Sequence, residues 1–217
     1  MTSEEKKQET LTAEHRKKIQ AAVDGFALTD LYLVEHELYE CTVSHRFACY
    51  LFGQFAPEWN VDCEYNKIGD LEKYYRAIRT TSEKAIRGAL SKKLSILLSD
   101  SEYRLDDADF EIFRREAFPD IIIHKRGQTT VDENLLLIEI KVARNADPMD
   151  VVKLVEFTKG LREGEKLLLQ YKFGLSLSFG KPLIDGATKR GKVTGVLYFN
   201  GTSIEELSFP YAHTEKK

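Results

Sequence analysis

Two short apolar stretches separated by a polar turn constrain the fold of this chain more than any other feature. They are Phe118–Lys125, which reads FPDIIIHK, and Leu135–Val142, which reads LLLIEIKV. Short runs rich in isoleucine, leucine and valine favour β-strands. The intervening GQTTVDEN has the glycine, threonines, aspartate and asparagine that suit a hairpin loop. The sequence therefore predicts two adjacent antiparallel strands.

Charged residues interrupt the second stretch on one face only. Alternate side chains of a strand share a face, so Glu139 and Lys141 lie on the same face as Leu137. The other face stays apolar as far as Val142, and an apolar start on both faces is typical of a central strand. An isolated buried charge is costly. These two charges are therefore expected to be paired, solvated by a cleft, or bound to a metal.

Asp120 complements that pair from the first stretch, where it lies between Pro119 and three isoleucines. A hairpin brings Asp120 near Glu139, and two close carboxylates repel each other unless a cation lies between them. Oxygen ligands suit Mg²⁺, which neutralises the charge that develops in phosphoryl chemistry and lowers the pKa of an attacking water. A nearby lysine can stabilise the transition state. Asp120, Glu139 and Lys141 are thus candidate catalytic residues; the alternative is a structural ion pair at a strand end.

The remaining pattern predicts a mixed α/β domain. Apolar residues at three- and four-residue steps predict one long helix over Phe26–Phe55, which Ala56-Pro57 ends. Asp147 as N-cap and Pro148 at the first helical position predict another helix, which stops near Gly160. Further strands are expected at residues 59–65, 167–173, 174–179 and 193–199.

Residues 68–117 are expected to form a helical, partly basic insertion, with Ser82 capping its second helix. Eight Lys or Arg and three Asp or Glu lie between Lys67 and Lys93. Such a segment can bind a phosphate backbone by releasing counterions, and a solvated helix face is the alternative. Residues 1–18 are expected to be a polar segment, disordered or loosely helical. Residues 19–212 then form the domain, and residues 213–217 a polar tail.

Composition bounds the class of protein. A chain of 217 residues that is 42% hydrophobic and 31% charged is typical of one globular domain. It has no apolar run near the roughly 18–20 residues that cross a bilayer, and MTSEEKKQET lacks the apolar core of a secretory signal. We therefore expect a cytoplasmic protein without a membrane partner. Its three cysteines lack CxxC spacing, which favours buried free thiols over a zinc site or disulfides.

Pro119-Asp120, followed by Glu139-Ile140-Lys141 nineteen residues after Asp120, resembles the signature of the PD-(D/E)xK nuclease superfamily. The resemblance implies a restriction-endonuclease-like fold, which is a mixed central sheet flanked by helices. It also implies that Asp120, Glu139 and the backbone carbonyl of Ile140 bind Mg²⁺, with Mn²⁺ as an alternative. Lys141 would then be the catalytic lysine.

The chain also resembles a branch of uncharacterised bacterial and phage members of that superfamily, from about Glu40 to Phe179. Glu40 lies five residues before His45-Arg46, as in that branch. The resemblance implies that Glu40 adds a site carboxylate, for which a surface glutamate is the alternative. Lys153 and Tyr171 match the branch further on and are candidates for binding substrate phosphate in the cleft, with packing and solvation as the alternative.

These resemblances imply a metal-dependent endonuclease that hydrolyses phosphodiester bonds in defence, repair or recombination. DNA is the expected substrate, and RNA stays open because a fold does not fix a substrate. A homodimer also stays open. The alternative from another class is a non-catalytic nucleic-acid-binding or scaffold protein on a nuclease fold. A third hypothesis is a nuclease that a partner activates through the insertion.

Overall fold

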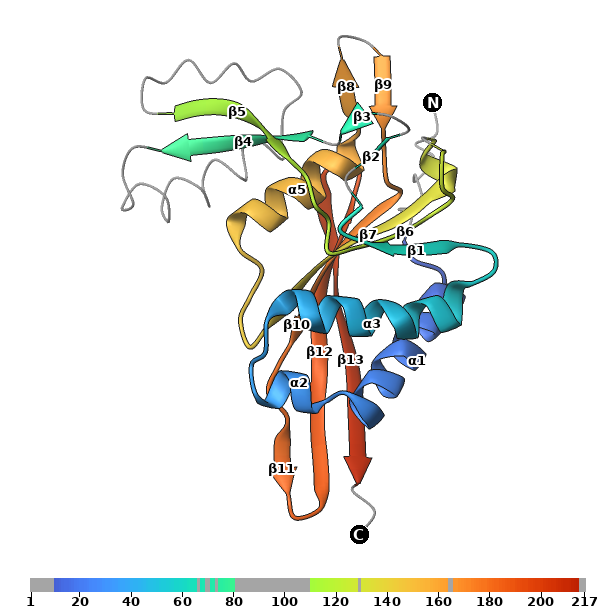
Figure 1. Ribbon diagram of the computed structural model, residues 1–217, viewed down its shortest axis with the longest axis vertical. Helices are drawn as coiled ribbons and strands as arrows, with labels where there is room; N and C mark the ends of the chain where they lie inside the picture. Colours follow the sequence, from blue (N-terminus) through green and yellow to red (C-terminus); the bar gives the residue numbers. More distant parts are fainter. Residues whose placement is uncertain are drawn as a thin grey trace, which may run out of the picture.

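A computed structural model describes residues 10–65, 67–68, 71–72, 74–80, 110–128, 130–163 and 166–214. These residues form a mixed α/β fold around one seven-stranded sheet (Figure 1). Along the sheet the strands are, in order, β1 (Asn60–Cys63), β6 (Ile121–His124), β7 (Asn134–Val142), β10 (Phe173–Phe179), β12 (Thr188–Phe199) and β11 (Leu183–Asp185), and β13 (Thr202–Thr214) also pairs with β12. The sequence interpretation did not include β11 or β13, and β13 extends into the expected polar tail.

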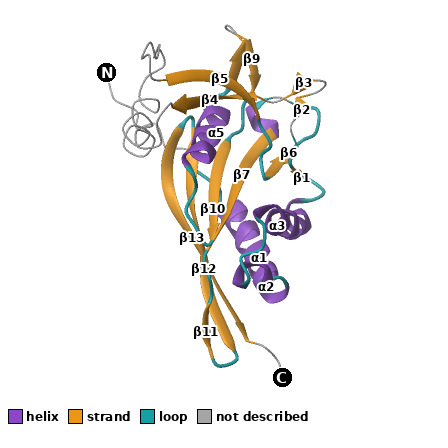
Figure 2. Cartoon of the chain, turned by 60° about the vertical axis from the view of Figure 1, so that its left-hand side comes forward, coloured by secondary structure: helices purple, strands orange, loops and turns teal. Residues whose placement is uncertain are grey.

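The central strand β7 carries the predicted pattern. It pairs antiparallel with β6, as predicted, and parallel with β10 on its other side. All nine of its residues are buried. Ile138 and Ile140 pack into the larger core under the first three helices, whereas Leu137 packs into a second core under α5. The sheet is therefore covered on both faces around β7, as Figure 2 shows.

Three helices cover one face: α1 (Ala13–Thr29), α2 (Tyr32–Glu35) and α3 (Glu40–Phe55). The single helix predicted over Phe26–Phe55 is therefore wrong at its N-terminal part. The chain turns back near Glu37, whose φ is +47°, so that α3 packs beside α1. Phe26 and Phe47 both contact Phe179, with ring centroids 5.2 Å apart in each case. The apolar repeat continued across the break because both helices bury the same kind of face against the same sheet.

In the N-terminal half, residues 13–18 belong to α1, whose N-cap Thr12 accepts a hydrogen bond from the backbone N–H of His15, so this part of the polar segment is helical. Cys41 and Cys49 are exposed and Cys63 is half-buried, so the expectation of buried thiols is wrong. As predicted, α3 ends just before Ala56-Pro57 and is followed by β1.

The described part of the insertion is made of strands rather than helices. Here β2 (Lys67–Ile68) pairs with β3 (Leu71–Glu72), and β4 (Tyr74–Thr80) pairs antiparallel with β5 (Phe110–Glu116). The few apolar residues of 70–80 fit a short helical stripe and a strand about equally well, and tyrosine and isoleucine favour the strand. The expected helix that starts at Ser82 lies outside the described residues.

On the opposite face of the sheet from α1–α3 lies α5 (Pro148–Lys159), and the backbone of β4 lies against it. Asp147 is its N-cap and Pro148 its first residue, and Gly160 follows its end with a φ of +99°, as the sequence predicts. The remaining elements are η1 (Val131–Glu133), β8 (Leu161–Glu163) and β9 (Lys166–Leu169). Among the described residues, no helix is both long and apolar enough to cross a membrane.

Candidate active site

Asp120 and Glu139 occupy opposed positions on neighbouring strands. Ile121 of β6 is paired with Ile138 of β7, so Asp120, one residue earlier, is opposite Glu139. Directly opposed residues of antiparallel strands point to the same face of a sheet. The carboxylate of Asp120 accepts a hydrogen bond of 2.6 Å from the backbone N–H of Ile140. Burial raises the pKa of Asp120, although this hydrogen bond and the nearby lysines oppose the shift.

Glu139 is almost completely buried, with 1% of its surface exposed. Its Oε2 lies 2.5 Å from the ammonium of Lys153, whereas its Oε1 is buried without a hydrogen-bond partner among the described residues. Burial raises the pKa of Glu139 well above its usual range, and the charges of Asp120 and Asp150 add to this effect. An unsatisfied buried carboxylate oxygen is costly, so this atom is placed to accept a ligand.

Lys141 is bound by two carboxylates, but Glu139 is not one of them. Its ammonium lies 2.9 Å from Oδ2 of Asp150 and 3.0 Å from Oε2 of Glu40. Burial disfavours the charged form of Lys141, but these two carboxylates outweigh burial and raise its pKa. Lys141 therefore pairs with Asp150 and Glu40, and Glu139 pairs with Lys153 instead.

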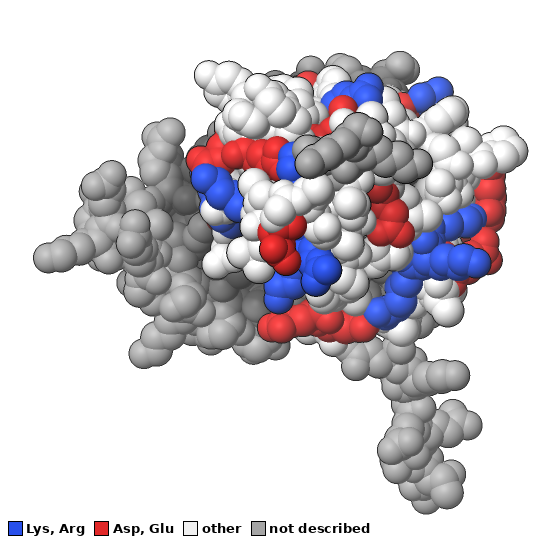
Figure 3. Space-filling view, turned by 90° about the horizontal axis from the view of Figure 1, so that it is seen from below, with Lys and Arg blue, Asp and Glu red and all other residues white. Residues whose placement is uncertain are grey.

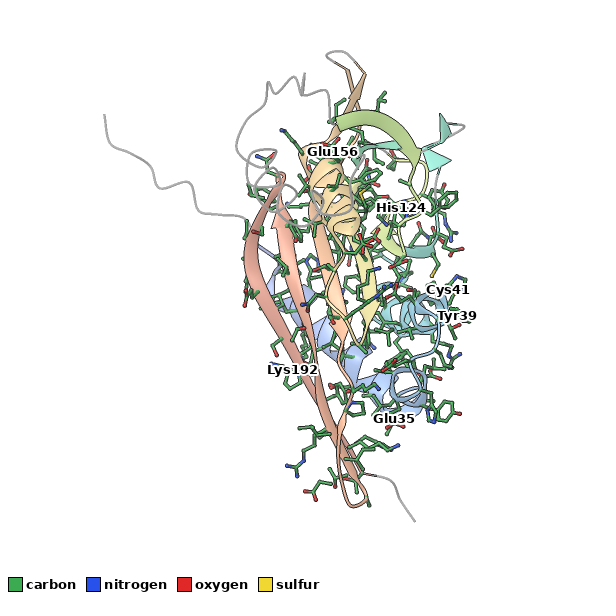
Figure 4. The ribbon with its side chains drawn as sticks, turned by 90° about the vertical axis from the view of Figure 1, so that its left-hand side faces the viewer. Glu35, Tyr39, Cys41, His124, Glu156 and Lys192 are labelled. Atoms are coloured by element: carbon green, nitrogen blue, oxygen red, sulfur yellow. The ribbon has the colours of Figure 1, made fainter. Side chains whose placement is uncertain are left out.

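Glu40 joins the cluster from the first residue of α3, not from the middle of a long helix as expected. Its neighbours Tyr39 and Cys41 mark this position in Figure 4. Besides Lys141, its carboxylate accepts a hydrogen bond from Nε of Arg144 at 2.9 Å and a long one from the backbone N–H of Val142. Glu40 is thus connected to the predicted residues through Lys141.

Helix α5 contributes Asp150 and Lys153. Asp150 is the third residue of α5, and its carboxylate and that of the N-cap Asp147 each accept a backbone hydrogen bond from the other residue. The carboxylate of Asp150 lies 2.9 Å from Lys141 and 3.5 Å from Lys153. Burial tends to raise the pKa of Asp150, but the two lysines outweigh this and lower it. The sequence interpretation assigned no site role to Asp150, although the helix start at Asp147-Pro148 marked this turn.

Lys153 was expected to bind substrate, but here its ammonium contacts Glu139 and Asp150. Burial lowers the pKa of Lys153, but the field of these carboxylates outweighs burial and raises it. Lys153 therefore supplies the positive charge that Glu139 needs in this structure.

Tyr171 does not line a cleft. It is completely buried in the core under α5, and its ring packs edge-on against Phe157 with centroids 6.1 Å apart. Burial raises the pKa of its hydroxyl. The expectation that Tyr171 binds substrate is therefore wrong, because apolar packing encloses the side chain.

Asp62 of β1 belongs to a separate network of charged side chains. The carboxylate of Asp62 is bound by the guanidinium of Arg126 and, at 2.8 Å, by Nε2 of His124. Arg126 is the main cause of the lowered pKa of Asp62, ahead of His124. This network is structural.

The carboxylates of Asp120 and Glu139 are the candidate oxygen ligands for a divalent cation. Within the residues the structure describes, no three His, Cys, Asp or Glu side chains form a metal-binding group. Mg²⁺ nevertheless keeps several waters and commonly takes only one or two carboxylates. The buried, unpartnered Oε1 of Glu139 and the carboxylate of Asp120 are the atoms that would hold it, and the family resemblance adds the backbone carbonyl of Ile140.

Comparison with protein-family models, curated proteins and solved structures gives no match to this chain. Any functional conclusion therefore depends on the residues and their geometry.

The raised pKa values of Asp120 and Glu139 predict an unusual pH dependence of stability. Because these pKa values are raised, Asp120 and Glu139 hold a proton up to a higher pH in the folded protein than in the unfolded chain, where carboxyls release theirs near about pH 4. Protonation of these carboxyls therefore stabilises the fold fully at pH values below their pKa values in the unfolded chain. This stabilisation is lost as the pH rises through their pKa values in the folded protein. Without divalent metal, we expect them to lower the free energy of unfolding by up to about 1.4 kcal/mol per pH unit for each proton lost.

Divalent metal is expected to reverse this loss, since it binds the deprotonated carboxylates. Thermal unfolding between about pH 5 and about pH 8 should show a Mg²⁺-induced rise in Tm that grows with pH. In Glu139→Gln the rise should be much smaller at every pH. A Mg²⁺ effect that is independent of pH would argue against these two carboxyls as the ligands.

Proposed function

We propose that this protein is a Mg²⁺-dependent nuclease that hydrolyses phosphodiester bonds, with DNA as the expected substrate and Mn²⁺ as an alternative metal. The proposal includes a restriction-endonuclease-like arrangement of the sheet. The observation that carries it is the buried Glu139, whose Oε1 has no partner among the described residues while Asp120 lies directly opposite. Lys141 follows two residues later on the same face of β7.

The charges of the cluster support cation binding. Among the described residues, two buried ammonium groups, those of Lys141 and Lys153, interact with the carboxylates of Glu40, Glu139 and Asp150, and their charges also act on Asp120. Arg144 adds one charge from the exposed side. The raised pKa values of Asp120 and Glu139 indicate that these charges do not fully compensate the two carboxyls. A divalent cation would do so.

Each residue then has a distinct role. The carboxylates of Asp120 and Glu139 hold the ion, and the hydrogen bond from Ile140 orients Asp120. When bound, Mg²⁺ supplies positive charge to the reacting phosphoryl group and lowers the pKa of an attacking water. Lys141, held by Asp150 and Glu40, offers a fixed ammonium to the same group. The two carboxylates that hold Lys141 are not proposed metal ligands, so metal binding at Asp120 and Glu139 would leave its position unchanged.

Nucleic acid as the partner is supported by the composition of the basic segment and by the position of its described strand β4. The face shown in Figure 3 has acidic and basic side chains intermingled, without a broad patch of one sign among the described residues. The net charge of the chain is −3. The segment from Lys67 to Lys93 is basic, and β4, which lies within it, packs against the helix that carries Asp150 and Lys153. This arrangement favours phosphate contacts beside the cluster.

Reversing charges in that segment should weaken the binding of duplex DNA to the same extent whatever the base sequence of the DNA. We expect the double variant Lys84→Glu, Arg87→Glu to have a lower affinity for duplex DNA. The slope of log K against log salt concentration should become shallower by about 0.9 for each phosphate that the variant no longer binds. Affinity is measured by fluorescence anisotropy at several salt concentrations, with Ca²⁺ in place of Mg²⁺. Lys192→Glu, at an exposed position of β12, is the control and should keep the wild-type slope. An unchanged slope in the double variant would indicate a solvated surface.

The test of the proposed function is a panel of substrates. Purified protein is incubated with supercoiled plasmid, linear duplex, single-stranded DNA and RNA, each with Mg²⁺, Mn²⁺ or a chelator. We expect metal-dependent cleavage, strongest on DNA. Asp120→Asn, purified in the same way, controls for contaminating nucleases. Binding without cleavage by folded wild-type protein would favour the non-catalytic alternative.

A further inference from the structure

The two lysines of the cluster are held in different ways. Lys141 is fixed between Asp150 and Glu40, at 2.9 and 3.0 Å, and neither carboxylate is one of the proposed metal ligands. Lys153 contacts Oε2 of Glu139 at 2.5 Å and is more distant from Asp150, at 3.5 Å. Its main partner is therefore a proposed metal ligand.

The ammonium of Lys153 lies among the negative charges that would also attract a metal ion at Asp120 and Glu139. The charges of Glu139, Asp150 and Asp120 all act on it. Its side chain is nearly buried, with 12% exposed, and arises from α5, on the face of the sheet that Glu139 and Asp120 share. A lysine stem is long and flexible, so its charge can move without a change of backbone. A divalent cation that binds Glu139 must therefore compete with this ammonium.

We propose that Lys153 is a tethered counter-ion, which occupies the position of the divalent cation in the metal-free protein and leaves Glu139 when the metal binds. This inference rests on the proposed function, because it takes Asp120 and Glu139 as the metal ligands. Lys153 stabilises the carboxylates when metal is scarce and weakens metal affinity through competition. Its released ammonium is then free to contact a substrate phosphate.

Lys141 provides a matched control, because it is a buried lysine of the same charge in the same cluster. If long-range repulsion alone acted on the metal, removing either lysine would tighten metal binding to a similar degree. If Lys153 is the competing ion, its removal has a much larger effect, since Lys141 contacts other carboxylates. The two variants thus separate local competition from the general field of the cluster.

The experiment measures Mn²⁺ binding by isothermal titration calorimetry, without nucleic acid, for wild type, Lys153→Met, Lys153→Arg and Lys141→Met. We expect Lys153→Met to bind Mn²⁺ about tenfold more tightly than wild type, a change of about 1.4 kcal/mol. Lys141→Met should stay within about threefold of wild type. Lys153→Arg, which keeps the charge, should bind no more tightly than wild type.

Thermal unfolding gives a second measurement. Without metal, Lys153→Met leaves Glu139 without its counter-ion, so its Tm near neutral pH should fall below that of Lys153→Arg. Mn²⁺ should raise the Tm of Lys153→Met more than that of wild type. If Lys153→Met folds only with Mn²⁺, that requirement supports the same inference, and Lys153→Arg still tests the effect of charge.

The outcomes separate this inference from the proposed function. Equal tightening in Lys153→Met and Lys141→Met, or weaker binding in Lys153→Met, would overturn the counter-ion role. If the Mn²⁺ affinities of wild type and the variants follow the expected order but no substrate is cleaved, the nuclease proposal is wrong and the counter-ion role of Lys153 is still supported. No Mn²⁺ binding by the folded wild type would overturn both.

Discussion

Lys141→Ala is expected to lower the rate of phosphodiester cleavage by about 100- to 1,000-fold while the protein still folds and binds metal. The two carboxylates that lose Lys141 each keep another cation. Asp150 keeps Lys153 at 3.5 Å, and Glu40 keeps Arg144 at 2.9 Å. Single-turnover cleavage of plasmid DNA measures the first effect. Circular dichroism measures whether the variant folds, and the Mg²⁺-induced rise in Tm measures whether it still binds metal.

The control for Lys141→Ala is Lys189→Ala. Lys189 forms a partly buried ion pair of 2.9 Å with Glu35, outside the cluster, so its removal should affect stability and leave cleavage unchanged. Wild-type cleavage by Lys141→Ala would exclude a catalytic role for this lysine. Failure of Lys141→Ala to fold even with Mg²⁺ would instead favour a purely structural role.

Asp120→Asn is expected to abolish cleavage, with a loss of at least about 1,000-fold, and to weaken metal binding without destabilising the metal-free protein. The amide oxygen of asparagine can still accept the hydrogen bond from the N–H of Ile140. The substitution also removes a carboxylate whose pKa is raised by burial. The Tm without metal near neutral pH should therefore equal or exceed that of wild type, as thermal unfolding can show.

Asp30→Asn is the matched control and should behave in the opposite way. Asp30 is partly buried, but Arg46 and Tyr50 outweigh burial and lower its pKa. Its ionised form therefore stabilises the fold, and the asparagine variant should be less stable but fully active. If Asp120→Asn lost as much stability as Asp30→Asn, Asp120 would be a structural residue and not a metal ligand.

The elements around Asp120 and Glu139 were predictable because their determinants are local. Strand β7 follows from the short aliphatic run over Leu135–Val142, and the hairpin with β6 follows from the polar turn. The start of α5 follows from Asp147-Pro148. Once the two strands are paired, the opposed positions of Asp120 and Glu139 follow from the register.

The partners of the charged residues were not predictable, because they depend on packing between distant segments. Proximity in sequence suggested a pair between Glu139 and Lys141. Two residues along a strand, however, separate their backbones by about 6.6 Å. The observed pairs instead join β7 to α5 and α3, through Lys153 for Glu139 and through Asp150 and Glu40 for Lys141. Those contacts exist only after the helices pack.

Two other errors have physical causes of the same kind. The apolar repeat of residues 26–55 contains no strong breaker, and only the fold shows that the chain turns near Glu37. Tyr171 was expected in the cleft because it matches the uncharacterised branch, but the core under α5 buries it completely. Burial of an aromatic residue is decided by tertiary packing and not by its neighbours in sequence.

The central claim is that Glu139 holds a catalytic metal, and one comparison tests it most directly. Wild type and Glu139→Gln are incubated with supercoiled plasmid at equal concentrations over a range of Mg²⁺, with a chelator series in parallel. We predict that wild type cleaves only with metal, and that folded Glu139→Gln does not cleave at any Mg²⁺ concentration. Cleavage by Glu139→Gln at the wild-type rate, or wild-type cleavage that persists in the chelator, would contradict the claim.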